Sequence, residues 1–195
     1  MRTSNTLFVP ITSRRDYLEY LEADLKAHRL DRWRVYYRWK YPVLAWQRWL
    51  RRAEYRTNCS RTWIGRLYAK LLRLHSRNRG MRLGFTIPIN VFGPGLCLPH
   101  WGTIVVNDKA RVGAHCRLHP GTCIGEAFGG APTIGDHAYI GPGAKIYGGI
   151  VLGDYVRIGA NTVVGRSFPE GHITLLGAPA RALERALETV PATRQ

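Results

Sequence analysis

Aliphatic residues recur every six positions in the second half of the chain. The main series is Ile134, Ile140, Ile146, Leu152, Ile158 and Val164. A second series, two residues before it, is Ala138, Ala144, Ile150, Val156 and Thr162. An α-helix repeats about every 3.6 residues and a strand every 2, so neither produces this period. A chain that alternates a short strand with a turn does, and the pattern predicts a β-solenoid.

The six-residue period extends upstream and is interrupted once. Val112, Leu118 and Ile124 continue the main series, but Ile124 and Ile134 are ten residues apart. Four extra residues must therefore leave the solenoid within the sequence GEAFGGAPT. Its three glycines and one proline suit a surface loop.

The first half has the spacing of helices. Thr12 and Ser13 can cap a helix that ends near His28, and Pro42 can open a second one. Ser60 can cap a third, whose apolar stripe is Ile64, Leu67, Leu71 and Leu74. Residues 77–80 resemble a linker. We therefore expect three parts: a helical region over 1–80, the solenoid over 81–182, and a C-terminal helix or tail over 183–195.

Positive charge is concentrated in the helical region. The net charge of the chain is +16, and residues 1–80 contain 19 Lys and Arg against 6 Asp and Glu. Over residues 30–62 the basic residues alternate with Trp and Tyr. This composition suits packing within an assembly, contact with an anionic membrane, or nucleic-acid binding. We favour packing first and membrane contact second, and nucleic acid is the least favoured partner.

Targeting signals and redox chemistry point to the cytoplasm. The N-terminal sequence lacks the apolar segment of a signal peptide, and no apolar run approaches the ~18 residues of a membrane span. Four cysteines show no CxxC spacing and are expected to be reduced thiols. The expected location is cytoplasmic, peripheral at the inner membrane face if membrane contact occurs.

His100 interrupts the apolar series. Counting back in sixes from Val112 and Val106 reaches His100, where an aliphatic residue is expected. Departures from a local rule concentrate at functional sites. An imidazole with a pKa near 6.5 can accept a proton at neutral pH and can serve as a general base. A hydrogen-bonded structural histidine is the alternative.

Several segments resemble the hexapeptide-repeat acyltransferases, in their serine acetyltransferase-like branch. The repeat, LPHWGTIVV, APTIGD, YIGPGAKIYGGI and LLGAPAR occur in the family's order over about residues 55–182. Within that branch, LGFTIPINVFGPGLCLPHWGTIVVN is most similar to enzymes of polysaccharide and capsule assembly. The resemblance implies a left-handed parallel β-helix, a homotrimer with clefts between subunits, and acetyl-CoA as co-substrate.

The same resemblance assigns residues. It implies that His100 is the catalytic base. Gly143 and Ala160 match small positions beside the pantetheine arm of CoA, and Arg166 and Arg181 match positions that meet its phosphates. The GAPAR segment, with Ala178, closes the last turn.

Three departures from the serine enzymes indicate another acceptor. Pro99, Ala131 and Phe85 stand where those enzymes have Asp, His and an acidic residue. An amino-acid substrate needs charged partners for its ammonium and carboxylate groups. We therefore expect a sugar hydroxyl to be favoured over serine.

Other polar residues complete the candidate list. His119 is a second candidate, because a polar residue there can face the acceptor in sugar-modifying relatives. Asn107, Asp108 or a backbone carbonyl can orient His100. His115 and His137 occupy equivalent turn positions, but no acidic residues support them as a metal site, so no metal is expected.

These observations predict an acetyl-CoA-dependent O-acetyltransferase of cell-surface or exopolysaccharide synthesis, with a sugar acceptor and direct transfer, since no Cys or Ser stands out as a nucleophile. The first alternative is a serine O-acetyltransferase. The second, from another class, is a trimeric scaffold or a metal-dependent hydratase on the same fold.

Overall fold

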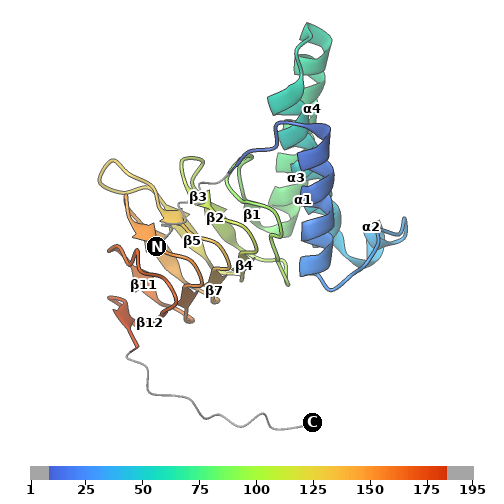
Figure 1. Cartoon of the computed structure of the whole chain (residues 1–195). Helices are drawn as coiled ribbons and strands as arrows, with labels where there is room; N and C mark the ends of the chain where they lie inside the picture. The colour runs from blue at the N-terminus through green and yellow to red at the C-terminus, as the bar shows by residue number, and fades with distance from the viewer. Residues whose placement is uncertain (1–8, 184–195) are drawn as a thin grey trace, which may run out of the picture.

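The computed structural model describes residues 9–183, and Figure 1 shows a helical part joined to the first turn of a solenoid. The predicted C-terminal helix lies outside the described residues, apart from Leu183. Within residues 9–183, no helix combines the length and the apolar character that a bilayer span requires. The helices are α1 (Arg14–Ala27), α2 (Tyr37–Lys40), α3 (Pro42–Cys59) and α4 (Trp63–Leu83).

Helix ends follow the capping residues closely. Ser13 Oγ accepts the amide of Asp16 (3.1 Å), and Asp16 Oδ2 accepts the amide of Ser13 (2.9 Å), which forms a capping box for α1. Pro42 is the first residue of α3, as predicted. The predicted cap of α4 is wrong, because Thr62 Oγ1, and not Ser60, accepts the amide of Gly65 (3.1 Å).

The predicted linker over residues 77–80 is also wrong. Helix α4 continues through it to Leu83, and Gly84 ends the helix with φ 85°. A residue with a Cβ is strained at that angle, whereas glycine adopts it readily. The helical part therefore extends three residues past the expected boundary and leads directly into β1.

The remainder is a parallel β-solenoid with three faces, which confirms the predicted fold class. Its strands are two or three residues long. Face A contains β1 (Phe85–Thr86), β2 (Ile104–Val106), β5 (Cys123–Gly125), β8 (Lys145–Tyr147) and β11 (Val163–Val164). Face B contains β3 (Arg111–Val112), β6 (Thr133–Ile134) and β9 (Val151–Leu152). Face C contains β4 (Arg117–Leu118), β7 (Tyr139–Ile140), β10 (Arg157–Ile158), β12 (Thr174–Leu176) and an antiparallel β13 (Arg181–Ala182).

The six-residue series forms the core of this solenoid. Each aliphatic residue pairs in register with its counterpart one turn away, and all of them are buried. The three stacks are Val112, Ile134 and Leu152 on face B; Leu118, Ile140 and Ile158 on face C; and Ile124, Ile146 and Val164 on face A. Burial of these side chains is the main source of stability for a repeat fold.

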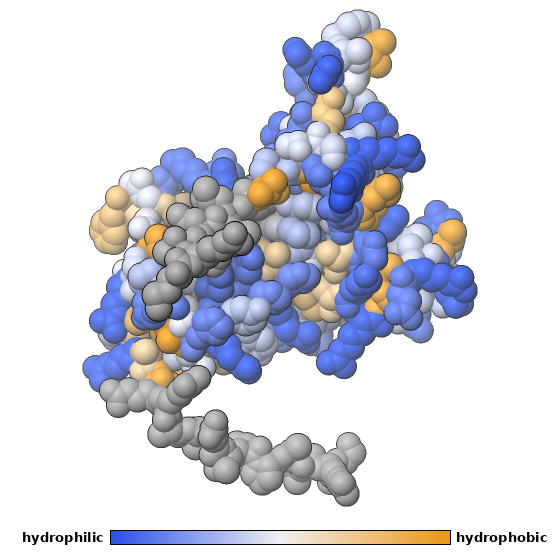
Figure 2. Space-filling view, viewed as in Figure 1, coloured by the Kyte–Doolittle hydropathy of each residue, from blue (hydrophilic) through white to orange (hydrophobic). Residues whose placement is uncertain are grey.

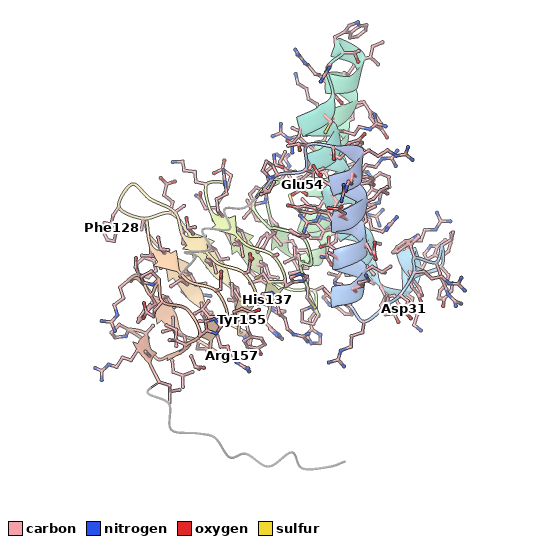
Figure 3. The ribbon with its side chains drawn as sticks, viewed as in Figure 1. Asp31, Glu54, Phe128, His137, Tyr155 and Arg157 are labelled. Carbon is pink, nitrogen blue, oxygen red and sulfur yellow. The ribbon has the colours of Figure 1, made fainter. Side chains whose placement is uncertain are left out.

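The interruption after Ile124 is a loop. Val106 pairs with Ile124, 18 positions later, whereas Ile124 pairs with Ile146, 22 positions later. The four extra residues project between β5 and β6, where Ala127 and Gly130 pair with each other. Phe128 lies at the tip of this loop and is 99% exposed (Figure 3).

The position of His100 differs from the simple count of sixes. Cys97 on face C bridges to Arg117, and Val105 on face A pairs with Cys123. The segment from face C to face A therefore has two more residues in this turn, from 97 to 105, than in the next turn, from 117 to 123. Leu98, and not His100, therefore occupies the buried position over Leu118. His100 does not replace a core residue; it lies on a lengthened corner that exposes it.

A buried ionic cluster joins the helices to the solenoid. Arg51 on α3 donates to Asp24 on α1 (Nε–Oδ2, 2.8 Å) and to Glu54 (3.1 Å), with both partners almost fully buried. The same guanidinium donates to the carbonyls of Phe92 (2.8 Å) and Gly93 (2.7 Å). Asp24 Oδ1 also accepts the amides of Gly95 and Leu96. Figure 3 shows Glu54 among these packed helices.

We predict that Arg51→Ala lowers the free energy of unfolding by about 3–5 kcal/mol, because Asp24 and Glu54 would remain buried without their cation. Urea unfolding followed by circular dichroism measures this. The control is Arg14→Ala on the exposed side of α1, which we expect to change stability by no more than about 0.5 kcal/mol. Equal effects of the two substitutions would contradict the role given to the cluster.

Candidate active site

The candidate site is the corner between face C and face A, which we call the His100 corner. It comprises residues 99–103 and the corresponding corner residues of the later turns, 119–122, 141–144, 159–162 and 177–178. Hydrogen bonds join it from turn to turn: the amide of Gly121 donates to Thr103, and that of Gly143 to Pro120 (3.0 Å). Side chains on successive turns therefore lie next to one another.

His100 and His119 come together at this corner. Their ring centroids are 6.5 Å apart, with an interplanar angle of 44°. His100 is exposed, whereas His119 is partly buried and its Nε2 atom has no hydrogen-bond partner. The hydroxyl of Thr122 donates to the backbone carbonyl of His119 (2.7 Å), which fixes the turn. One imidazole is thus open to solvent, and a second has a buried nitrogen without a hydrogen-bond partner nearby.

His119 favours its neutral form. Burial lowers the pKa of His119, and the nearby positive groups Arg117 and His100 lower that pKa further. A neutral imidazole has one nitrogen that donates and one that accepts a hydrogen bond. Nε2 is buried as well as unpartnered, so it can bond only to a substrate group that reaches in beside the ring.

Face C adds an aromatic and a basic residue that the sequence patterns did not single out. The ring of Tyr139 lies 5.2 Å from that of His119, and the Arg157 guanidinium lies 5.6 Å from the Tyr139 centroid. Figure 3 labels Arg157 at the end of the solenoid away from the helices. Arg117, Tyr139 and Arg157 pair in register. Each directly precedes a core residue in the six-residue series, so the outward positions of the repeat would have revealed them.

A track with few side chains leads away from the two histidines. Gly143 (φ 76°) and Ala160 lie at this corner on successive turns, and Ala178 follows on the next. A Cβ added to Gly143 would lie 2.0 Å from Asn161 Oδ1, so this position must be glycine. The Asn161 side chain fills the space over Gly143, so an extended ligand arm can approach the backbone at the exposed Ala160 and Ala178 instead.

The predicted phosphate-binding arginines lie near the end of this track. Arg181 is on β13 beside Leu176, and both are exposed. Arg166 follows β11 on the neighbouring corner, where its guanidinium lies 4.8 Å from the centroid of the Phe168 ring. Arg181 is thus closer in the fold to Ala178 than Arg166 is.

The structure does not bring Asn107 to His100. Strand β2 separates them, and Asn107 Oδ1 accepts the amide of Lys109 (2.8 Å) within its own turn. Asp108 lines a groove beside α4. Phe85 is buried and packs against Trp46, with ring centroids 5.0 Å apart. None of these three residues orients His100 within this chain.

Three other histidines and a tyrosine form a separate stack on the corner between faces B and C. The rings of His115, His137, Tyr155 and His172 stack in that order at centroid distances of 4.8, 4.5 and 4.7 Å. Figure 3 labels His137 and Tyr155 side by side. Nitrogen lone pairs lie in the ring planes, so those of stacked imidazoles do not converge on one ion. Residues 9–183 contain no group of three His, Cys, Asp or Glu side chains able to hold a metal.

Sequence comparisons relate this solenoid to bacterial acyltransferases. Residues 131–166 match the family described as "Bacterial transferase hexapeptide (six repeats)". The serine acetyltransferase of Synechococcus elongatus is 34% identical over 98 residues, which cover 48% of this chain and 40% of that protein. The enzyme of Helicobacter pylori strain J99 is 36% identical over 97 residues, covering 48% and 56%. The chain thus spans about half the length of these curated relatives.

Solved structures agree on the fold. The serine acetyltransferase of Brucella abortus strain S19 has a TM-score of 0.64 at 28% identity, covering 87% of this chain and 70% of that one. The soybean serine acetyltransferase apoenzyme has a TM-score of 0.68 at 28% identity, covering 87% and 69%. A serine acetyltransferase in complex with CoA matches at 22% identity with a TM-score of 0.63, which supports the fold alone.

The predicted sugar acceptor is wrong. These curated relatives and solved structures are named serine acetyltransferases, and the comparisons do not support a special closeness to polysaccharide enzymes. The expectation relied on absent side chains at positions 85, 99 and 131. A residue beside the corner, Arg117 on β4, carries charge that can pair with an amino acid. The chain has a hexapeptide-repeat β-solenoid and is similar, over about half of its length, to serine acetyltransferases.

Proposed function

We propose that this protein transfers the acetyl group of acetyl-CoA to the hydroxyl of serine at the His100 corner. The observation that carries the proposal is the pairing of an exposed His100 with the unpartnered Nε2 of His119, at the start of the track through Gly143 and Ala160. We choose serine and acetyl-CoA as the substrates because the chain is similar to serine acetyltransferases.

His100 is the general base in this proposal. Its imidazole takes the proton of the serine hydroxyl as the oxygen attacks the thioester carbon. The carbon–sulfur bond then breaks, and the CoA sulfur recovers the proton from the imidazolium. The products are O-acetylserine and CoA. General-base catalysis of this kind contributes about 10²–10⁴-fold to the rate.

His119 and Arg117 position the acceptor. The neutral Nε2 of His119 accepts a hydrogen bond from the substrate, and the Arg117 cation attracts its carboxylate. Arg117 precedes the buried Leu118 on face C, and its Nη1 lies 3.7 Å from Cys97 Sγ. This arrangement provides a charged partner that positions 85, 99 and 131 lack.

The CoA arm follows the track. The small, exposed Ala160 and Ala178 allow the pantetheine chain to approach the backbone beyond Gly143, and Arg181 and Arg166 bind its phosphates by charge. We further propose that the protein works as a homotrimer, in which a neighbouring subunit covers this exposed corner. Exposure of Trp101 (67%) beside His100 supports such a contact.

We predict that His100→Asn lowers kcat/KM for serine and acetyl-CoA by about 10²–10⁴-fold, because the base is lost. Release of the CoA thiol, followed with a thiol reagent, measures the rate. His172→Asn is the matched control, since it removes an exposed histidine from the other corner and should leave the rate unchanged. Full activity of His100→Asn would contradict the assignment, and an inactive wild-type protein with serine would contradict the acceptor.

We also predict that His119 titrates below the ordinary pKa of about 6.5, because burial and Arg117 disfavour its cation. NMR titration of its ring protons measures this pKa. Arg117→Gln removes one of these causes and should raise the pKa of His119. The unfolded chain binds more protons than the folded one just below pH 6.5, so His119's contribution to stability is lost as pH falls. A His119 midpoint at or above 6.5 would show that the buried ring does not favour its neutral form.

A further inference from the structure

Helix α4 has an unusual distribution of side chains between its two sides. Its buried side consists of Ala69, Leu72, Ser76 and Gly80. Trp46 Nε1 donates to the carbonyl of Ser76 (2.9 Å), and a Cβ on Gly80 would lie 3.0 Å from the same nitrogen. The small residues thus allow α4 to pack closely on α3.

The large apolar residues of α4 are on its exposed side. Trp63 is 74% exposed and Leu71 58% exposed, so the stripe predicted from the sequence is not part of the core. At about 100° per residue the stripe lies nearly opposite the buried side. We call it the α4 stripe; its members are Trp63, Ile64, Leu67, Leu71, Leu74 and Met81. Figure 1 shows α4 extending beyond the solenoid.

Positive charge borders the α4 stripe. Residues 61–83 contain seven Lys and Arg and no Asp or Glu. Lys70, Arg73 and Arg77 lie along one flank, where with Leu74 they line a groove of about 740 Å³ between α4 and the first turn of the solenoid. Figure 2 shows this end of the molecule as blue residues around a few orange ones. An occupant must therefore combine apolar surface with negative charge.

A second copy of α4 would supply the apolar surface but not the negative charge. Ile64, Leu67, Leu71 and Leu74 have the alternating spacing of three and four residues typical of a coiled coil. However, Lys70, Arg77 and Arg82 would occupy the flanking positions, where they would face the basic residues of the second helix. Like charges at these positions repel.

An anionic bilayer meets both parts of the requirement. The α4 stripe is on a convex helix surface, and Tyr68 and Trp63 lie at its edges, where aromatic residues suit the headgroup level. Within residues 30–62, Trp46 and Arg51 are buried in the fold, whereas Val35, Tyr36 and Trp39 are exposed near the short helix α2. The longer apolar stripe with a basic flank is on α4, so the proposal is made for α4.

We propose that α4 lies in the headgroup layer of an anionic membrane, with the α4 stripe inserted among the acyl chains and its basic flank on the lipid phosphates. The proposal is independent of acetyl transfer. In this position, α4 holds the solenoid next to the membrane surface without crossing the bilayer.

Vesicle flotation tests it with the full chain. Vesicles of phosphatidylcholine alone are compared with equal parts phosphatidylcholine and phosphatidylglycerol, at low and high salt. We expect binding only to the anionic vesicles, weakened by salt, with a blue shift of tryptophan emission. Binding to neither vesicle type would overturn the proposal.

Matched variants locate the contact. Leu71→Gln should weaken binding on the order of ten-fold and Arg73→Glu at least about five-fold. Leu18→Gln and Arg14→Glu make the same changes at exposed positions on α1 and should bind like wild type. Because all four positions are exposed, thermal melts should stay unchanged. Equal binding by all variants would overturn the proposal, as would self-association without vesicles that Leu71→Gln abolishes.

Discussion

Backbone hydrogen bonds between successive turns determine where every functional group in this protein lies. The amide of Val105 donates to the carbonyl of Thr122 (3.0 Å), that of Cys123 to Ala144 (3.0 Å), and that of Lys145 to Thr162 (2.9 Å). This in-register stacking means that a corner residue on one turn lies beside the corner residue of the next. It brings His100 next to His119 and stacks Gly143 against Asn161, the neighbour of Ala160, although these residues are far apart in the chain. The candidate site is thus a consequence of the repeat.

The second constraint is the ionic cluster of Arg51, Asp24 and Glu54. It binds α1 and α3 to the backbone of the first turn through Phe92, Gly93 and Gly95. These hydrogen bonds bury the side of α1 and α3 that faces the solenoid, and they fix the helical part to the end of the solenoid. Helix α4 packs on α3 by its small residues, and its large apolar residues remain outside. The same packing that stabilises the helical part thereby creates the surface that we assign to the membrane.

Much of the fold could be predicted from the sequence, because a six-residue aliphatic period has one physical explanation. The stacks through Ile134, Ile140 and Ile146 and the loop at Phe128 followed from spacing alone. The register of His100 did not, since two extra residues in its corner leave no mark in the apolar pattern. Tyr139 and Arg157 lie on the outer side of the solenoid, where the aliphatic period of the core carries no information. The acceptor does not follow from the side chains absent at positions 85, 99 and 131, because Arg117 on the neighbouring strand also carries charge. The exposure of the α4 stripe could not be predicted from the spacing of its apolar residues, because a buried stripe has the same spacing.

We propose that acetyl transfer takes place at the corner shared by His100 and His119. The most direct test is a crystal structure determined from crystals of the protein that were soaked with CoA and serine. We expect the CoA thiol and the serine hydroxyl beside the His100 imidazole, with the pantetheine arm passing Gly143 and Ala160. CoA bound elsewhere on the solenoid, with its thiol remote from His100, would contradict the claim.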